Sequence, residues 1–217
     1  MIFIETKTLN LCTPSKTNLQ QWTNWVNNPS VRNTIINITT PITFDMQWNW
    51  IQSELNSNKR VLLEICDKLT NEFLGVVSLS TINYQRRSAQ IATLSPITKK
   101  VKNRYCVYEA RRAIVEYALN QLSINKIYGA MIYPDNESFM VNNMCMGFEI
   151  EGIKNEGSWY NNKPKMSVCY FITKAIYEKK GITEKDLEKL LARENRNNNK
   201  KKLNDIISSL YVNTNNS

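Results

Sequence analysis

Histidine is absent from the 217-residue sequence. Without an imidazole the chain cannot build a Ser-His or Cys-His nucleophilic pair, and it lacks the side chain that most often transfers protons near neutral pH. Most zinc sites also use histidine, so we expect no metal centre. The absence therefore removes several common classes of hydrolase and metalloenzyme.

Cysteine is scarce, and no two cysteines have the Cys-x-x-Cys spacing of a redox or metal-binding motif. The five are Cys12, Cys66, Cys106, Cys145 and Cys169. An odd number of widely spaced cysteines, mostly within apolar runs, is typical of buried, reduced thiols. This pattern favours a cytoplasmic protein without a disulfide framework.

Long apolar runs are also missing. None approaches the roughly 18 residues that a membrane-spanning helix needs. The first ten residues, MIFIETKTLN, have an acidic residue where a signal peptide has a basic end and a long apolar stretch. We therefore expect no membrane partner and no export by a signal peptide.

The charge is strongly positive, with a net value of +9 and an isoelectric point near 9.3. Such a surplus favours anionic partners: a phosphorylated cofactor, a nucleic acid or an acidic surface. Residues 174–217 hold ten Lys or Arg against six Asp or Glu, which leaves +4 there and +5 over residues 1–173. Because the charge is spread, it does not predict one nucleic-acid-binding stripe.

The length and the 42% hydrophobic content allow one sizeable core, so we expect one globular domain over residues 1–173. Hydrophobic periodicity predicts a largely antiparallel sheet of about seven strands, flanked by helices, in the mixed α/β class. The expected strands are 2–12, 60–66, 72–82, 89–94, 125–133, 148–160 and 164–172. Helices are expected at 17–28, at 43–57 with Thr43 as its cap, from 105 over about five turns, and from 136 to 147.

The last segment, residues 174–217, has a different character. Thr183 and Asp186 resemble a capping box before a narrow leucine stripe, which predicts a helix. The low-complexity run NRNNNKKK, residues 195–202, is expected to be mobile. We favour a helical arm packed on the domain, and a nucleic-acid-binding or partner-binding tail is the alternative.

Four local segments carry a more specific signal. They are WTNWVNNPSVRNTI, FLGVVSLSTINYQRRSAQIATLSP, VKNRYCVYEARR and YPDNESFMVNNMCMGFEIEG. Together with the element order they resemble the GNAT superfamily of coenzyme A-dependent N-acyltransferases. The branch they resemble most contains the ribosomal-protein N-terminal acetyltransferases and the amino-sugar N-acetyltransferases. The second segment has Gln90 where many members have glutamate, and the fourth matches through Asn136 and Gly147.

The resemblance implies acetyl-coenzyme A as the co-substrate. Strand 88–94 would diverge from the strand that begins at residue 125, and the pantetheine arm would pair with backbone groups near Thr93 and Leu94. The pyrophosphate would lie at the N-terminus of the helix that begins near Tyr105, where unpaired N–H groups and the helix dipole attract anions. Transfer to an amine then needs positioning and the loss of one proton.

The pyrophosphate loop of the family corresponds to Lys102, Asn103, Arg104, Tyr105, Cys106 and Val107. The cation at the first position is kept in type, but Tyr105 and Val107 stand where the family has small residues, chiefly glycine. Glycine lets a phosphate approach the backbone closely, so these side chains narrow the predicted cradle. The alternative interpretation of this stretch is a solvated basic turn.

The predicted catalytic residues are Gln90, Tyr133 and Asn143. Asn143 stands where many members have the tyrosine that protonates the departing thiolate, and it is also a candidate to bind the cofactor. Gln90 cannot accept a proton. The base would be Glu64, Glu109, Tyr133 or a water molecule, unless the amine arrives neutral. Three of these residues have a structural alternative: Glu109 interacts favourably with the helix dipole, Tyr133 fits a core position, and Asn143 fits a polar position on a short helix.

Asn136 has two interpretations, because asparagine is a natural helix cap and the family uses this position near the cofactor. The leading functional hypothesis is acetyl transfer from acetyl-coenzyme A to a primary amine of a protein, a small molecule or an amino sugar. The alternative is a catalytically degenerate GNAT-fold binding module. Nucleic-acid association through the basic tail is a third hypothesis that we favour less.

Overall fold

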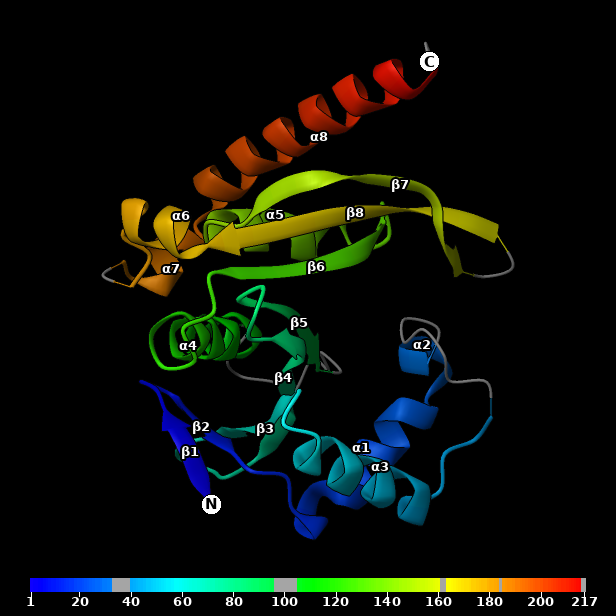
Figure 1. The fold of residues 1–217 in the computed structure, drawn as a ribbon, viewed down its shortest axis with the longest axis vertical. Coiled ribbons are helices and arrows are strands. Elements are labelled where there is room, and N and C mark those ends of the chain that lie inside the picture. The colour runs from blue at the N-terminus through cyan, green and yellow to red at the C-terminus, as the bar shows by residue number, and fades with distance from the viewer. Residues whose placement is uncertain (33–39, 96–104, 161–162, 184, 216–217) are drawn as a thin grey trace. The chain divides into compact units, whose positions relative to one another are not determined.

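The computed structural model describes residues 1–32, 40–95, 105–160, 163–183 and 185–215 (Figure 1). They form two compact units, Met1–Ser123 and Ile124–Ser217, and both combine antiparallel strands with helices. The mixed α/β class predicted from the sequence is confirmed. The described residues contain eight strands, where about seven were expected.

The first unit contains a five-stranded antiparallel meander. In sheet order its strands are β1 (Ile2–Glu5), β2 (Leu9–Cys12), β3 (Val61–Asp67), β4 (Phe73–Asn83) and β5 (Ser88–Leu94). Its helices are α1 (Lys16–Asn27), α2 (Pro29–Arg32), α3 (Phe44–Asn56) and α4 (Cys106–Asn120). The predicted cap of α3 is confirmed, because the Thr43 hydroxyl accepts a hydrogen bond from Met46 N at 3.2 Å.

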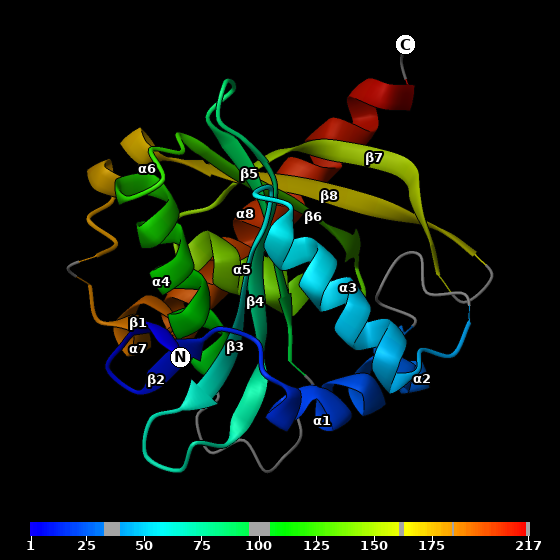
Figure 2. The same cartoon turned by 60° about the horizontal axis from the view of Figure 1, so that its bottom comes forward.

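Helices cover both faces of this meander, with α1 and α3 on one side and α4 on the other (Figure 2). Leu62, Val76 and Leu94 point to the face of α1 and α3, where they pack with Trp22 and Ile51. The alternate residues of these strands face α4. Because both faces are covered, β3 and β4 read in the sequence as nearly continuous apolar runs.

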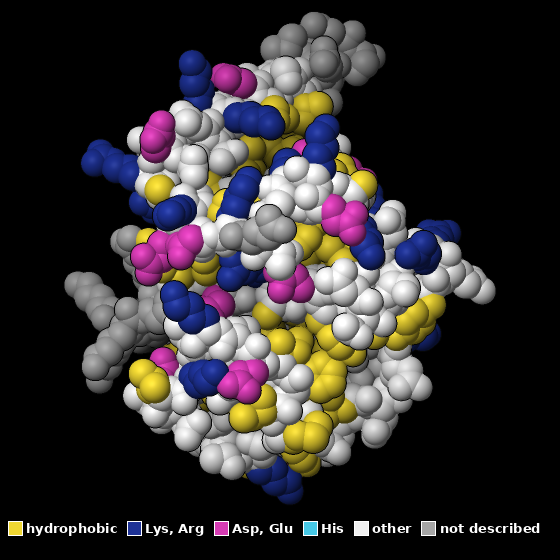
Figure 3. Space-filling model, turned by 90° about the vertical axis from the view of Figure 1, so that its left-hand side faces the viewer, with side chains coloured by type: hydrophobic (Ala, Val, Ile, Leu, Met, Phe, Trp, Pro, Cys, Tyr) yellow, Lys and Arg dark blue, Asp and Glu magenta, His cyan; other side chains and the backbone are white. Residues whose placement is uncertain are grey.

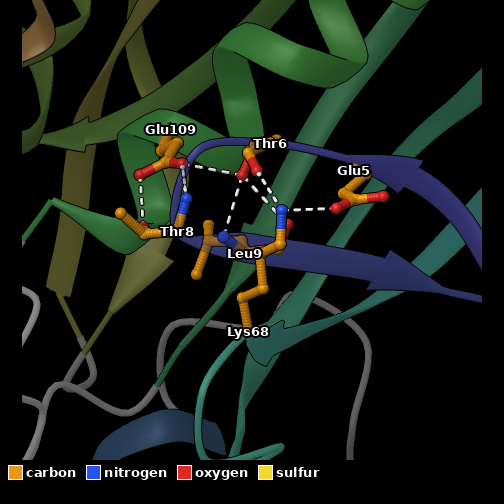
Figure 4. A network of polar contacts seen from close by, with 6 residues as sticks. All are labelled: Glu5, Thr6, Thr8, Leu9, Lys68 and Glu109. Carbon is orange, nitrogen blue, oxygen red and sulfur yellow. Dashed lines mark hydrogen bonds and ion pairs between the residues drawn. The ribbon is translucent and has the colours of Figure 1, made fainter.

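The expected first strand, residues 2–12, is instead two short strands joined by a turn, and this corrects the prediction. The cause is the buried carboxylate of Glu109 on α4 (Figure 4). Glu109 Oε1 accepts hydrogen bonds from Thr6 Oγ1 at 2.7 Å and Thr8 N at 2.8 Å, and Oε2 accepts one from Thr8 Oγ1 at 2.7 Å. These contacts hold the turn against the start of α4 and interrupt the strand.

The second unit contains three antiparallel strands in the order β6-β8-β7. They are β6 (Lys126–Tyr133), β7 (Glu149–Tyr160) and β8 (Lys163–Thr173). Its helices are α5 (Glu137–Cys145), α6 (Lys174–Lys179), α7 (Leu187–Leu190) and α8 (Arg193–Asn215). No described helix is long and apolar enough to span a bilayer.

The segment after β8 packs within this second unit. Lys180 Nζ donates to the carbonyl of Gly147, just after α5, at 3.1 Å and pairs with Glu149 at 2.9 Å. Gly147 has a φ of +93°, which favours glycine, and a Cβ there would lie 3.2 Å from Ile182 Cγ1. The end of α5 is thus closed by the C-terminal segment. The predicted boundary at residue 173 stays a prediction.

Two expectations for the C-terminal segment need correction. Asp186, and not Thr183, caps α7, because its carboxylate accepts hydrogen bonds from Glu188 N at 2.8 Å and Lys189 N at 3.2 Å. Residues 195–202, expected to be mobile, lie in α8. On the face shown in Figure 3, Lys and Arg side chains alternate with Asp and Glu and make no continuous basic stripe.

Replacing Glu109 with Gln should lower the free energy of unfolding by about 2 kcal/mol, because the amide nitrogen cannot accept the hydrogen bond that a carboxylate oxygen accepts. The control change Glu72→Gln, at an exposed position before β4, should cost less than about 0.5 kcal/mol. Urea denaturation at pH 7 measures both. Equal losses would contradict the anchoring role of Glu109.

Candidate functional site

The C-terminal end of β5, at Thr93 and Leu94, is held by close contact with β4. A Cβ on Gly75 would lie 2.5 Å from the carbonyl oxygen of Leu94, so only glycine allows the two strands to approach this closely. One residue beyond the strand, Ser95 Oγ donates to the carbonyl of Leu74 at 2.7 Å. Gly75, the glycine of the FLGVV segment, therefore fixes the C-terminal end of β5.

A buried arginine holds the same strand end from the face that α4 covers. Arg111, in the second turn of α4, is completely buried, and its Nη1 donates to Thr93 Oγ1 at 3.0 Å. A guanidinium is always charged, and burying it is costly unless its donors are bonded. Arg111 thus joins α4 to the strand on which the sequence places the pantetheine contacts.

Gln90 lies on the opposite face of β5 from Thr93. It pairs with Ser80 of β4, and by strand alternation its side chain shares the face of Leu94, toward α1 and α3. Of the three predicted site residues of β5, Gln90 and Leu94 therefore face α1 and α3, and Thr93 faces α4. A half-buried amide at this position can orient a ligand by hydrogen bonds.

The start of α4 offers backbone groups rather than side chains. Tyr105 occupies the N-cap position, and its carbonyl accepts hydrogen bonds from Tyr108 N and Glu109 N, both at 2.9 Å. The side chains of Cys106 and Val107 are buried, and burial raises the pKa of the Cys106 thiol to about 11. An anion here would meet the N–H groups of the first turn. Lys102, Asn103 and Arg104 lie outside the described residues.

Asn136, at the start of α5, and Asn143, within it, differ in how deeply their side chains are buried. Asn136 is the N-cap residue, and its carbonyl accepts hydrogen bonds from Phe139 N and Met140 N, both at 3.1 Å. Its half-buried side chain makes no capping hydrogen bond, so the simple capping interpretation is not supported. Asn143 is completely buried, and its Nδ2 donates to the carbonyl of Phe139 at 2.7 Å.

Tyr133 closes β6, and its hydroxyl donates to Asn204 Oδ1 on α8 at 3.2 Å. Burial raises the pKa of the Tyr133 phenol above its usual value of 10.0, and the nearby Glu137 carboxylate raises it further. The Lys200 ammonium lowers the pKa of Tyr133, and it pairs with the Glu137 carboxylate at 2.6 Å. A phenol that holds its proton at neutral pH is suited to donate a proton and unsuited to accept one.

The two carboxylates considered as bases are both engaged in structural contacts. Glu64 is 1% exposed, and its oxygens accept hydrogen bonds from Ser15 N at 2.9 Å and Asn18 Nδ2 at 2.7 Å. Burial raises the pKa of Glu64, and these two hydrogen bonds lower it in part. Glu109 holds the β1–β2 turn. Neither carboxylate is exposed for proton transfer with a bound amine.

Three residues beside predicted site residues were not identified from the sequence: Arg111 in the first unit, and Lys200 and Asn204 in the second. For Arg111 a signal existed, because it lies four residues after Val107 and three before Ile114, on the apolar stripe of its helix. Lys200 belongs to the run read as low-complexity, residues 195–202, and Asn204 lies two residues after it. Neither position gave a signal of a defined contact. Within the described ranges, no group of three or more Cys, Asp or Glu side chains could hold a metal ion.

Comparison with known proteins agrees with the fold. The model of the acetyltransferase (GNAT) domain matches residues 8–141, which is more than half of the chain. The spermidine N-acetyltransferase from Vibrio cholerae, solved with CoA and spermine, is 20% identical with a TM-score of 0.70, over 80% of this chain and 99% of that chain. A probable acetyltransferase is 16% identical with a TM-score of 0.68, over 81% and 98%. No curated protein matches the sequence.

These matches define the class as the acyl-coenzyme A-dependent N-acetyltransferases. The chain belongs to the GNAT acetyltransferase family. The family uses acetyl-coenzyme A, and the solved structures, at this level of identity, show the shared fold.

The raised pKa of Glu64 makes stability depend on pH. The folded protein keeps the Glu64 proton at pH values where the unfolded chain has lost it, so the free energy of unfolding should fall as the pH rises from about 4.5 through the raised pKa. Glu64→Gln should remove this contribution to the change of the free energy of unfolding with pH. Urea titrations between pH 4 and pH 8 compare Glu64→Gln with wild type and with Glu72→Gln, at an exposed position before β4. Equal slopes in all three proteins would refute it.

Proposed function

We propose that this chain transfers an acetyl group from acetyl-coenzyme A to a primary amine. The observation that carries the proposal is the fixed end of β5, where Gly75 holds Leu94 from the adjacent strand β4 and Arg111 holds Thr93 from α4. A strand whose backbone must pair with an extended ligand has to be rigid, because ordering it during binding would reduce affinity.

In the first unit, the backbone of Thr93 and Leu94 would pair with the pantetheine arm. The first-turn amides of α4, at Tyr105, Cys106 and Val107, would bind the pyrophosphate. The cations Lys102 and Arg104, together with Asn103, would add charge and donors beside it. The side chains of Cys106 and Val107 are buried and would not contact the pyrophosphate themselves.

In the second unit, Asn136 would hydrogen-bond the cofactor, because its amide makes no capping contact with α5. Asn143 would act indirectly: it is completely buried and donates to the carbonyl of Phe139, so it supports α5 rather than touching the ligand. We therefore place Asn136, and not Asn143, in direct contact with the ligand.

The proton chemistry would depend on Tyr133 and Gln90. In the reaction a C–N bond forms, the C–S bond breaks, the amine loses a proton and the departing thiolate gains one. Tyr133 would give that proton to the thiolate and would be reprotonated by solvent. Gln90 would orient the amine without accepting its proton. The amine must therefore arrive neutral or lose a proton to water before it attacks, and the proton released after the C–N bond forms also passes to water.

The acceptor would be a primary amine, and polyamines are the first compounds to assay, because the Vibrio cholerae neighbour is a spermidine N-acetyltransferase. The net charge of +9 opposes the approach of a polycation, which makes neutral or anionic amines the second group. Protein N-termini and amino sugars belong to it.

A binding module without catalysis is the second candidate function. What supports it is the family resemblance, in which Tyr105 and Val107 stand where the loop has small residues, chiefly glycine. Ligand binding without release of free thiol, with any amine, would favour this function.

The first test is a thiol-release assay with acetyl-coenzyme A, a panel of amines and the variant Asn136→Ala. We expect turnover by wild type, and an increase of about tenfold in the KM for acetyl-coenzyme A when the Asn136 amide is removed. Asn120→Ala, at an exposed position of α4, is the matched control and should leave KM unchanged. If acetyl-coenzyme A gives neither turnover nor a rise in thermal midpoint, the proposal fails.

A further inference from the structure

Helix α8 reaches a predicted catalytic residue from the segment that follows β8. This segment comprises residues 174–217. Its last helix contacts α5 and β7 within the second unit.

Packing sets the position of α8 on α5. Leu203 is completely buried and Ile207 is 7% exposed, on one stripe of an otherwise polar helix. Asn199 on the same stripe donates to Cys145 Sγ at 3.4 Å. These contacts place the next polar residues of α8 beside the end of β6 and the start of α5, where Asn204 meets Tyr133 and Lys200 meets Glu137.

We propose that α8 supplies two positioning residues for Tyr133: Asn204 orients the phenol, and Lys200 sets the charge around it. This inference rests on the proposed function, in which Tyr133 donates a proton to the departing thiolate. The site on the second unit is then incomplete without α8.

The Asn204 amide suits a residue that loses and regains a proton. Its Oδ1 accepts the phenol hydrogen, and the same side chain also carries an N–H donor. To give its proton to the thiolate, the Tyr133 hydroxyl turns its hydrogen away from Asn204. Rotation of the exposed amide then lets Nδ2 donate to the phenolate. The ring thus has a hydrogen-bonding partner in both protonation states.

Lys200 acts through Glu137. The charged groups near the Tyr133 hydroxyl are Glu137 on α5 and Lys200 on α8, and an ion pair between Asp135 and Lys165 of β8 lies close in sequence to the end of β6. Lys200 neutralises Glu137 at 2.6 Å. Without this cation, the carboxylate would disfavour the phenolate that forms when Tyr133 gives up its proton.

The first experiment titrates Tyr133 directly by NMR, in protein labelled with ¹³Cζ-tyrosine, with the signal assigned through Tyr133→Phe. Lys200→Ala should move the Tyr133 pKa to higher pH, because the negative charge of Glu137 then acts without opposition. Lys201→Ala, the next residue on the exposed side of α8, should leave it unchanged. An unchanged pKa in Lys200→Ala, or equal shifts in both variants, would overturn the proposal.

The second experiment is a double-mutant cycle on turnover. Asn204→Ala should lower kcat about fivefold with the KM for acetyl-coenzyme A unchanged, and should have no further effect in Tyr133→Phe. Asn197→Ala, on the exposed face of α8, is the control. An equal loss in the Tyr133→Phe background would overturn the proposal. If wild type transfers no acetyl group, the proposed function fails, and the NMR titration still decides whether α8 controls Tyr133.

Discussion

The buried carboxylate of Glu109 is the interaction on which the first unit depends. It binds Thr6 and Thr8, which lie about a hundred residues earlier, and so fixes the N-terminal strands to the first turn of α4. The same turn carries the backbone amides proposed to bind pyrophosphate. A carboxylate in the first turn also interacts favourably with the helix dipole. The Glu109 side chain therefore stabilises its own helix and the distant N-terminal strands together.

The end of β5 depends on this arrangement, because Arg111 of α4 holds Thr93 while Gly75 and Ser95 hold the strand to β4. A shift of α4 would therefore change the strand and the proposed phosphate site together. In the second unit, Tyr133 at the end of β6 lies beside the start of α5 and donates a hydrogen bond to Asn204 of α8. Each unit thus combines one strand end with one helix start.

The sequence predicted what depends on local patterns. Hydrophobic periodicity located α1, α3, α4 and most strands, and the Thr43 cap was readable because its partner is three residues away. The prediction of one strand over residues 2–12 failed, because the turn between β1 and β2 is held by Glu109, which is distant in the sequence. The prediction of a mobile run at 195–202 also failed, because packing of Leu203 and Ile207 overrides a composition typical of disorder. For the candidate site, the sequence indicated the types of the side chains and their order along the chain. It could not indicate the burial of Asn143 or the hydrogen-bonding partners of Tyr133.

The lack of histidine has a consequence for how such an enzyme would respond to acidity inside a cell. The proposed proton donor is a phenol whose pKa burial raises above its usual 10.0, and the chain has no imidazole to titrate near neutrality. Turnover between about pH 6 and pH 8 would then follow the protonation of the acceptor amine. The substrate, rather than the protein, would be the pH sensor of the reaction.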